Sequence, residues 1–254
     1  MRLLATDFDG TLFRGRTISA EDMAAVRAWR ARGNVFGIVT GRGAMTLMRE
    51  LDRFPLEWDF LLCNNGALLL DERARAVAAR PLARQVSRAL LRHEIAGTAT
   101  STAVFDGLAM HVIEGGGKWV NPAYDPPFMP LAEALERDFV QVSFGFAERE
   151  RAFDLGESLA RELGPLARVQ CSLAVADITA PEVGKDSGVE WACAIRGWRP
   201  EEIVAVGDDG NDVEMLERFG GWAMEGAEAR VLAAAAGTTA GIAELVSTKY
   251  GCLQ

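Results

Sequence analysis

Short apolar runs that stop abruptly at polar, glycine-containing turns recur near both ends of this chain, and they constrain its fold most. The predicted buried strands are residues 3–6, 35–39, 60–63, 203–206 and 221–224. A helix is predicted after most of them; the first runs from about Ala20 to Arg32, with Ser19 as its N-cap. Strands that alternate with helices at this spacing predict right-handed βαβ units and a parallel sheet.

The middle of the chain has a different pattern. Predicted helices at 84–94 and 148–163 accompany short strand-like segments and a Gly/Pro-rich stretch, 115–130. Hairpins and helices in this order are typical of an α+β module. We therefore predict an α/β core formed by residues 1–80 and 182–254, with residues 81–181 inserted as a second domain.

Composition and charge exclude several classes of protein. A net charge of −9 over 254 residues argues against a nucleic-acid binder, although local cations could still hold an anionic substrate. No signal peptide opens the sequence and no apolar run is long enough to span a membrane, so we expect a cytoplasmic protein without membrane partners. The four cysteines are far apart and are predicted to be unpaired packing residues: Cys63, Cys171, Cys193 and Cys252.

Four polar segments carry the residues suited to chemistry, and most of them follow a predicted strand. They are residues 7–11, 40–42, Lys185 and 207–212. In an open α/β sheet the carboxyl ends of the strands border the ligand crevice, so these segments could converge. Their carboxylates suit Mg²⁺, and their hydroxyl, ammonium and backbone N–H groups suit phosphate oxygens. Each segment alone could be an ordinary turn or a solvated lysine, but together they predict phosphoryl chemistry.

The same segments resemble the signature motifs of a known family. Asp7-Phe8-Asp9-Gly10-Thr11-Leu12, Thr40-Gly41-Arg42, Lys185 and Gly207-Asp208-Asp209-Gly210-Asn211-Asp212 are similar to the four motifs of the haloacid dehalogenase (HAD) superfamily. The similarity is greatest to its Cof-type (class IIB) sugar-phosphate phosphatases, which Asn64-Asn65-Gly66-Ala67 and Ala223-Met224-Glu225-Gly226-Ala227 also resemble. The resemblance implies a Rossmann-like, doubly wound core with an inserted α+β cap domain.

The resemblance also implies a role for each matching residue. Asp7 would be the nucleophile that forms an aspartyl-phosphate, and Asp9 the general acid and base. Thr40 and Lys185 would complete the catalytic set. Mg²⁺ would be held by Asp7, Asp9 through its backbone carbonyl, Asp208 and Asp212. The substrate and its phosphate would be bound by Phe8, Thr40, Gly41, Arg42, Lys185 and Asn211.

Two positions depart from the family pattern, and the leaving-group site is less defined. Asp186 directly follows the lysine and Glu225 replaces a usual glycine, so each could place a carboxylate near the phosphate; Asp186 could equally be a first-turn helix residue. The expected substrate is a small phosphorylated metabolite, in this branch a sugar phosphate, and the expected assembly is a monomer or small homo-oligomer. Candidate cap residues that would read the leaving group are His111, Lys118, Trp119, Asn121, Tyr124 and Asp125.

Three other functions are compatible with parts of this pattern. A sugar phosphomutase would use the same nucleophile, and the sequence does not separate it from a phosphatase. A non-catalytic binding protein would lack the nucleophile, the acid or a metal carboxylate, yet all are present. A carbon–halogen hydrolase would need neither Asp9 nor Asp208, so their presence argues against it.

Overall fold

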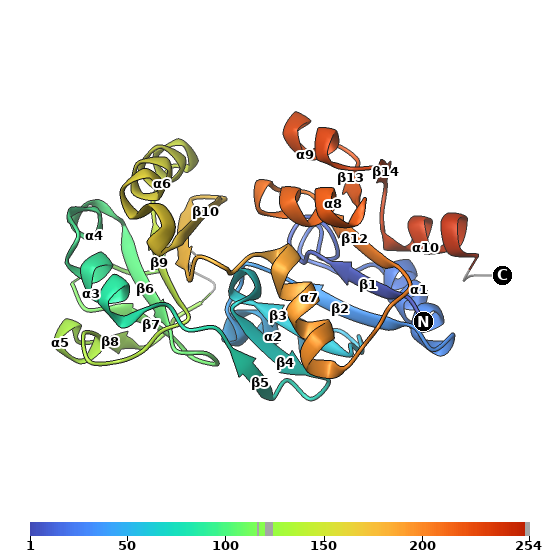
Figure 1. Cartoon of the computed structure of the whole chain (residues 1–254), viewed down its shortest axis with the longest axis horizontal. Helices are drawn as coiled ribbons and strands as arrows, with labels where there is room; N and C mark the ends of the chain where they lie inside the picture. Colours follow the sequence, from blue (N-terminus) through green and yellow to red (C-terminus); the bar gives the residue numbers. More distant parts are fainter. Residues whose placement is uncertain (116, 120–123, 252–254) are drawn as a thin grey trace.

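The computed structural model describes residues 1–115, 117–119 and 124–251 of the chain. Figure 1 shows two lobes, each built on its own β-sheet, with the N-terminus and the C-terminal helix in the same lobe. One sheet has eight strands and the other has six. The two sheets draw their strands from the parts of the sequence that we predicted to form the core and the insertion.

The eight-stranded sheet has the order β14-β13-β12-β1-β2-β3-β4-β5. Its strands are β1 (Leu3–Thr6), β2 (Val35–Val39), β3 (Phe60–Cys63), β4 (Leu68–Asp71), β5 (Ala76–Ala79), β12 (Ile203–Gly207), β13 (Trp222–Met224) and β14 (Gly237–Thr239). The six strands from β14 to β3 are parallel, whereas β4 and β5 form an antiparallel hairpin. The predicted α/β fold with a parallel sheet is therefore confirmed.

Helices cover both faces of this sheet because its strands are apolar on both sides. Leu4 and Ile38 belong to an apolar cluster that includes Trp29 of the first helix, whereas Leu3 and Ala5 pack into a second cluster on the other face. Ser19 Oγ accepts a hydrogen bond from Asp22 N (3.0 Å), as the predicted N-cap requires. The helices of this lobe are α1 (Ala20–Ala31), α2 (Ala44–Leu51), η1 (Asn64–Gly66), α7 (Lys185–Arg196), η3 (Gly210–Asp212), α8 (Val213–Phe219), α9 (Ala229–Ala234) and α10 (Ile242–Tyr250).

The six-stranded sheet has the order β10-β11-β9-β6-β7-β8 and is antiparallel except at β7–β8. Its strands are β6 (Ser101–Phe105), β7 (Met110–Ile113), β8 (Phe128–Met129), β9 (Gln141–Gly145), β10 (Arg168–Ser172) and β11 (Val175–Thr179). They are accompanied by α3 (Arg84–Arg92), α4 (Glu94–Thr98), α5 (Leu131–Ala134), α6 (Arg149–Leu163) and η2 (Gly164–Leu166). All of these elements lie between residues 81 and 181, and we propose this lobe as the cap domain.

The two faces of the cap sheet differ in polarity because successive side chains point to opposite sides of a strand. One face packs Val104, Val142 and Ile178 into an apolar cluster with the helices of this lobe. The other face carries Asp177 opposite Ser143, and Gln141 opposite Phe105. These polar side chains line the space between the lobes.

The predicted helix over 84–94 is instead two short helices. His93 has extended backbone dihedral angles, and its Nδ1 accepts a hydrogen bond from Ile95 N (3.2 Å) as the N-cap of α4. The described helices include none with the length and apolar character that a membrane span needs. Cys63, Cys171 and Cys193 are free thiols, while Cys252 lies outside the described residues.

Candidate active site

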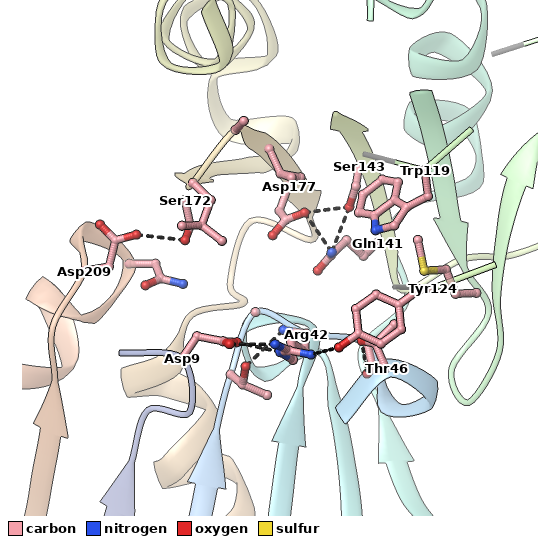
Figure 2. Close-up of a pocket in the computed structure, with 18 of the residues that line it drawn as sticks. Asp9, Arg42, Thr46, Trp119, Tyr124, Gln141, Ser143, Ser172, Asp177 and Asp209 are labelled. Carbon is pink, nitrogen blue, oxygen red and sulfur yellow. Dashed lines mark hydrogen bonds and ion pairs between the residues drawn. The ribbon is translucent and has the colours of Figure 1, made fainter. Parts of the chain in front are cut away.

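A cavity of about 650 Å³ lies between the two sheets and is lined by residues of both lobes. The core contributes residues from the loops after β1, β2 and β12, including Asp7, Asp9, Thr40, Gly41, Arg42, Asp208 and Asn211. Figure 2 shows Asp9 and Arg42 on the core side, facing Asp177, Gln141 and Ser143 on the other. The predicted convergence of the polar segments at the carboxyl ends of the strands is thus present in the fold.

Lys185 is buried next to the cavity, where its ammonium group contacts two buried carboxylates. Its Nζ donates to Asp7 Oδ1 (2.6 Å) and to Asp212 Oδ1 (2.6 Å), and the side chain is 1% exposed. Burial alone would lower the pKa of Lys185, but the two carboxylates raise it above its ordinary value. Burial raises the pKa of Asp7 well above its usual range, and Lys185 opposes that effect.

Three carboxylates meet beside this lysine in a group that could hold a metal ion. One oxygen from each of Asp7, Asp208 and Asp212 lies within 4.8 Å of the others. Asp212 Oδ2 accepts the N–H groups of Asp208 (3.0 Å) and Asp209 (3.1 Å), which fixes its orientation. Burial raises the pKa of Asp208 to about 6. Three carboxylates lie beside a single ammonium group, so the cluster has an excess of negative charge that a further cation could balance. Its oxygen donors suit Mg²⁺.

Gly10 allows the loops after β1 and β12 to approach each other. Its φ of +87° is in the left-handed region, and a Cβ at this position would collide with the Asp208 carboxylate. Thr11 Oγ1 donates to Asp208 Oδ1 (2.6 Å), so the residue after the glycine holds the opposing carboxylate in place. The Asp-x-Asp-Gly-Thr sequence therefore positions two of the candidate metal ligands.

Arg42 connects Asp9 to the cap. Its Nε and Nη2 donate to the two Asp9 carboxylate oxygens (2.6 Å each), and its Nη1 donates to the hydroxyl of Tyr124. Tyr124 in turn donates to Glu50 Oε1 (2.9 Å). Thr40 is buried, and its Oγ1 accepts the backbone N–H of Arg42 (3.1 Å). The phenyl ring of Phe8 is fully buried in the core, so only its backbone could take part in phosphate binding.

A chain of amide hydrogen bonds also crosses between the lobes. Asn211 Nδ2 donates to Asn65 Oδ1 (3.1 Å), and Asn65 Nδ2 donates to Asp177 Oδ2 (3.2 Å). Asn65 follows β3 with a φ of +55°, which asparagine adopts more easily than most residues. Farther along the lobe boundary, Ser172 Oγ donates to Asp209 Oδ2 (2.8 Å; Figure 2).

The five predicted leaving-group residues that the structure describes divide into three groups. Trp119 and Tyr124 line the main cavity. Lys118 and Asp125 line an adjoining hollow of about 290 Å³. His111 lines neither cavity, and its Nε2 lies 3.6 Å from Asp106 Oδ2. Asn121 falls outside the described residues.

The two departures from the family pattern lie away from the cavity lining. Asp186 is in the first turn of α7, and its carboxylate is 3.6 Å from Arg218 Nη1. Glu225 is exposed after β13. The interpretation of Asp186 as a first-turn helix residue matches this placement.

Sequence reasoning missed the polar group on the cap sheet. Asp177 Oδ1 accepts hydrogen bonds from Ser143 Oγ (2.6 Å) and Gln141 Nε2 (3.0 Å). Burial raises the pKa of Asp177 to about 6. The one available signal was the presence of polar residues at alternate positions of two otherwise apolar strands, β9 and β11.

Asp177→Asn is expected to flatten the pH dependence of stability. The pKa of Asp177 in the folded protein is above the ordinary value. Protonated Asp177 therefore contributes its full share to the unfolding free energy below about pH 4, and this contribution is lost as the pH rises through about 6. We expect the unfolding free energy of the wild type to fall by about 2 to 3 kcal/mol relative to Asp177→Asn between pH 4 and pH 7. Urea unfolding at several pH values measures this difference.

Asp138→Asn is the matched control, because it makes the same chemical change at an exposed position of the cap. Arg84 holds the pKa of Asp138 below its usual range, so this substitution should not stabilise the protein as the pH rises. Parallel stability profiles for the wild type and Asp177→Asn would contradict the raised pKa of Asp177.

Comparison with known proteins assigns the family. The model of the haloacid dehalogenase-like hydrolases matches residues 4–244. The chain belongs to this family. This HAD-like hydrolase is 29% identical to the pyridoxal phosphate phosphatase YbhA of Escherichia coli, over 92% of this chain and 91% of the relative. It is 26% identical to the E. coli 5-amino-6-(5-phospho-D-ribitylamino)uracil phosphatase YbjI, over 92% and 89% of the two chains.

Solved structures share the whole fold. A HAD/COF-like hydrolase from Plasmodium vivax superposes with a TM-score of 0.85 at 18% identity, covering 98% of this chain and 95% of that one. A sugar phosphatase of HAD subclass IIB superposes with a TM-score of 0.80 at 22% identity, covering 100% of both chains. The family and the curated relatives together identify this HAD-like hydrolase as a phosphoric monoester hydrolase that acts on a small phosphorylated substrate.

Proposed function

We propose that the chain is a Mg²⁺-dependent phosphatase that uses Asp7 as its nucleophile. The observation that carries this proposal is the placement of Asp7, which lines the cavity while its Oδ1 is held by Lys185. A nucleophile needs access to the substrate and a fixed orientation, and this arrangement supplies both.

The metal would be held by the side chains of Asp7, Asp208 and Asp212, together with the backbone carbonyl of Asp9. When bound, Mg²⁺ would neutralise charge on the phosphoryl oxygens and on the carboxylates. The close approach of the three carboxylates, with one ammonium group beside them, supports this assignment.

In the first step, an Asp7 carboxylate oxygen attacks phosphorus as the bond from phosphorus to the leaving oxygen breaks. Asp9 gives a proton to that oxygen, and the product alcohol departs. Thr40, the Gly41 N–H and Asn211 bind the phosphoryl oxygens, with Lys185 compensating their charge. Because Arg42 occupies both oxygens of Asp9, it has to release one of them for proton transfer.

In the second step, water attacks the phosphorus of the aspartyl-phosphate. Asp9 accepts a proton from this water, and the bond between phosphorus and the Asp7 oxygen breaks. Phosphate leaves, and Asp7 is restored. Asp9 thus serves first as acid and then as base, and its position at the cavity edge, with a side chain 40% exposed, supports contact with the leaving group.

We further propose a sugar phosphate, or a phosphomonoester of similar size, as the substrate. The cavity volume of about 650 Å³ accommodates such a molecule. The named substrates of the curated relatives, pyridoxal phosphate and a phosphoribitylamino uracil, are also small phosphomonoesters.

Phosphate release from p-nitrophenyl phosphate and a panel of sugar phosphates, with Mg²⁺ or with EDTA, tests this proposal. We expect turnover with Mg²⁺ and a loss of at least about a hundredfold with EDTA, because the metal supplies several kcal/mol of charge stabilisation. Restoring excess Mg²⁺ after EDTA is the control and should recover the rate. Full activity in EDTA would contradict the metal requirement, and rearranged sugar phosphates without phosphate release would indicate a mutase.

A further inference from the structure

Asp177 differs from the other buried carboxylates of the described chain in its partners. Asp7 and Asp212 are paired with Lys185, and Asp22, Glu50 and Asp71 are each paired with an arginine. No Lys, Arg or His among the described residues forms an ion pair with Asp177. Its hydrogen-bond donors are the neutral side chains of Ser143, Gln141 and Asn65. A buried carboxylate without a cation is costly, so a function is the expected reason for its retention.

The group around Asp177 faces the cavity and offers mainly hydrogen-bond acceptors. Asp177, Ser143 and Gln141 all line the cavity, and Figure 2 shows them opposite Asp9 and Arg42. The hydroxyl of Ser143 and the amide nitrogen of Gln141 are already engaged in donating to Asp177. The amide oxygen of Gln141 is buried without a hydrogen-bond partner among the described residues. A ligand that reaches this group must therefore bring donors of its own.

The surrounding walls are apolar and strengthen any charge interaction made there. Phe105, Met110, Trp119 and Phe146 line the cavity together with the polar group. A charge-assisted hydrogen bond becomes stronger when water is removed from such a site. The cavity thus has a phosphate end, beside Lys185 and the candidate metal ligands, and an acceptor end on the cap.

We infer that Asp177, with Gln141, selects a substrate whose leaving group carries a protonated nitrogen, and rejects one that carries a carboxylate. This inference rests on the proposed phosphatase function and names its substrate class. The nitrogen is either the amino group of an amino sugar phosphate, which is cationic at neutral pH, or the ring nitrogen of a pyridine phosphate, which becomes a cationic N–H donor once it is protonated beside the carboxylate. The raised pKa of Asp177 agrees with this role, because a cation at the site would restore the favourable charged state of the carboxylate.

Three six-carbon phosphate esters whose leaving groups differ in charge test the inference directly. Glucosamine 6-phosphate carries an amino group where glucose 6-phosphate has its C2 hydroxyl, and 6-phosphogluconate carries a carboxylate at C1 of an open chain of the same length. We expect kcat/KM for the wild type to be about tenfold to a hundredfold higher for the amino sugar than for glucose 6-phosphate, and lowest for 6-phosphogluconate. A preference for the acid would overturn the inference.

A second matched pair examines the heteroaromatic source of the nitrogen. Pyridin-3-ylmethyl phosphate and benzyl phosphate differ by a single ring atom. A preference for the pyridine ester, with no preference among the sugars, would assign the site to a ring nitrogen and would uphold the inference. No preference in either set would overturn it.

Asp177→Asn links the preference to this residue. The ratio of kcat/KM for glucosamine 6-phosphate to that for glucose 6-phosphate, or the corresponding pyridine ratio, should fall to about one. Asp138→Asn, an exposed cap position, should keep the wild-type ratio. A ratio unchanged in folded Asp177→Asn would overturn the assignment. Should that variant not fold, the wild-type ranking still decides, and absence of all turnover would reject the phosphatase proposal instead.

Discussion

Asp7→Asn should lower kcat for phosphate release by at least about 10⁴-fold, because a carboxamide cannot form the aspartyl-phosphate. The substitution keeps the shape of the side chain, and its amide oxygen can still accept the hydrogen bond from Lys185 Nζ. Burial disfavours the Asp7 carboxylate, so removing its charge should leave the protein folded. Steady-state phosphate release with Mg²⁺ measures the loss.

Asp52→Asn provides the matched control for this experiment. Asp52 follows α2 and is exposed, so the same change there should alter kcat by less than about twofold. Thermal unfolding of both variants separates loss of chemistry from loss of structure. A folded Asp7→Asn protein that retained a tenth or more of the wild-type kcat would contradict the role of Asp7.

Lys185→Met should lower the unfolding free energy by about 3 to 5 kcal/mol, in addition to abolishing turnover. Methionine fills a similar volume, but it leaves Asp7 and Asp212 buried without the ammonium group that each contacts at 2.6 Å. Removing one partner of a buried charge cluster leaves the remaining charges uncompensated. Urea unfolding with EDTA present measures this effect without a contribution from bound metal.

Lys249→Met is the control for the lysine substitution. Lys249 lies near the end of α10 with its Nζ 4.9 Å from the centroid of the Trp222 ring, so its loss should cost at most about 1 kcal/mol. Equal destabilisation by the two substitutions would mean that Lys185 does not hold the carboxylate cluster together.

The strands that position the site were predictable because each is a short apolar run followed by a polar turn. β1, β2, β3 and β12 meet this description, and the family resemblance added the expected roles of the residues after them. The hairpin β4–β5 was missed. Its first strand, Leu-Leu-Leu-Asp, is an apolar run like the others, but its partner, Ala-Val-Ala-Ala, is mostly alanine, which has weak strand preference, so the sequence did not indicate a hairpin.

The cap side of the cavity could not be predicted, because it depends on contacts between distant strands. Asp177 and Gln141 are 36 residues apart, and Asn65 contacts Asp177 from 112 residues away. From the sequence, most of the predicted leaving-group residues were in the Gly/Pro-rich loop, which contributes Trp119 and Tyr124 to the main cavity. The alternation of polar residues in β9 and β11 was the weaker signal, yet it marks the charged group of the cap.

Trapping of the phosphorylated enzyme tests the central proposal most directly. The enzyme is mixed with p-nitrophenyl phosphate and Mg²⁺, quenched during the first turnovers and treated with borohydride, which reduces an acyl phosphate to an alcohol. Peptide mass spectrometry should then find Asp7 converted to homoserine in the sample with substrate and Mg²⁺, and unchanged in the sample with EDTA. Phosphate release at the full rate with Asp7 unmodified throughout, or with the phosphoryl group on another residue, would contradict the mechanism.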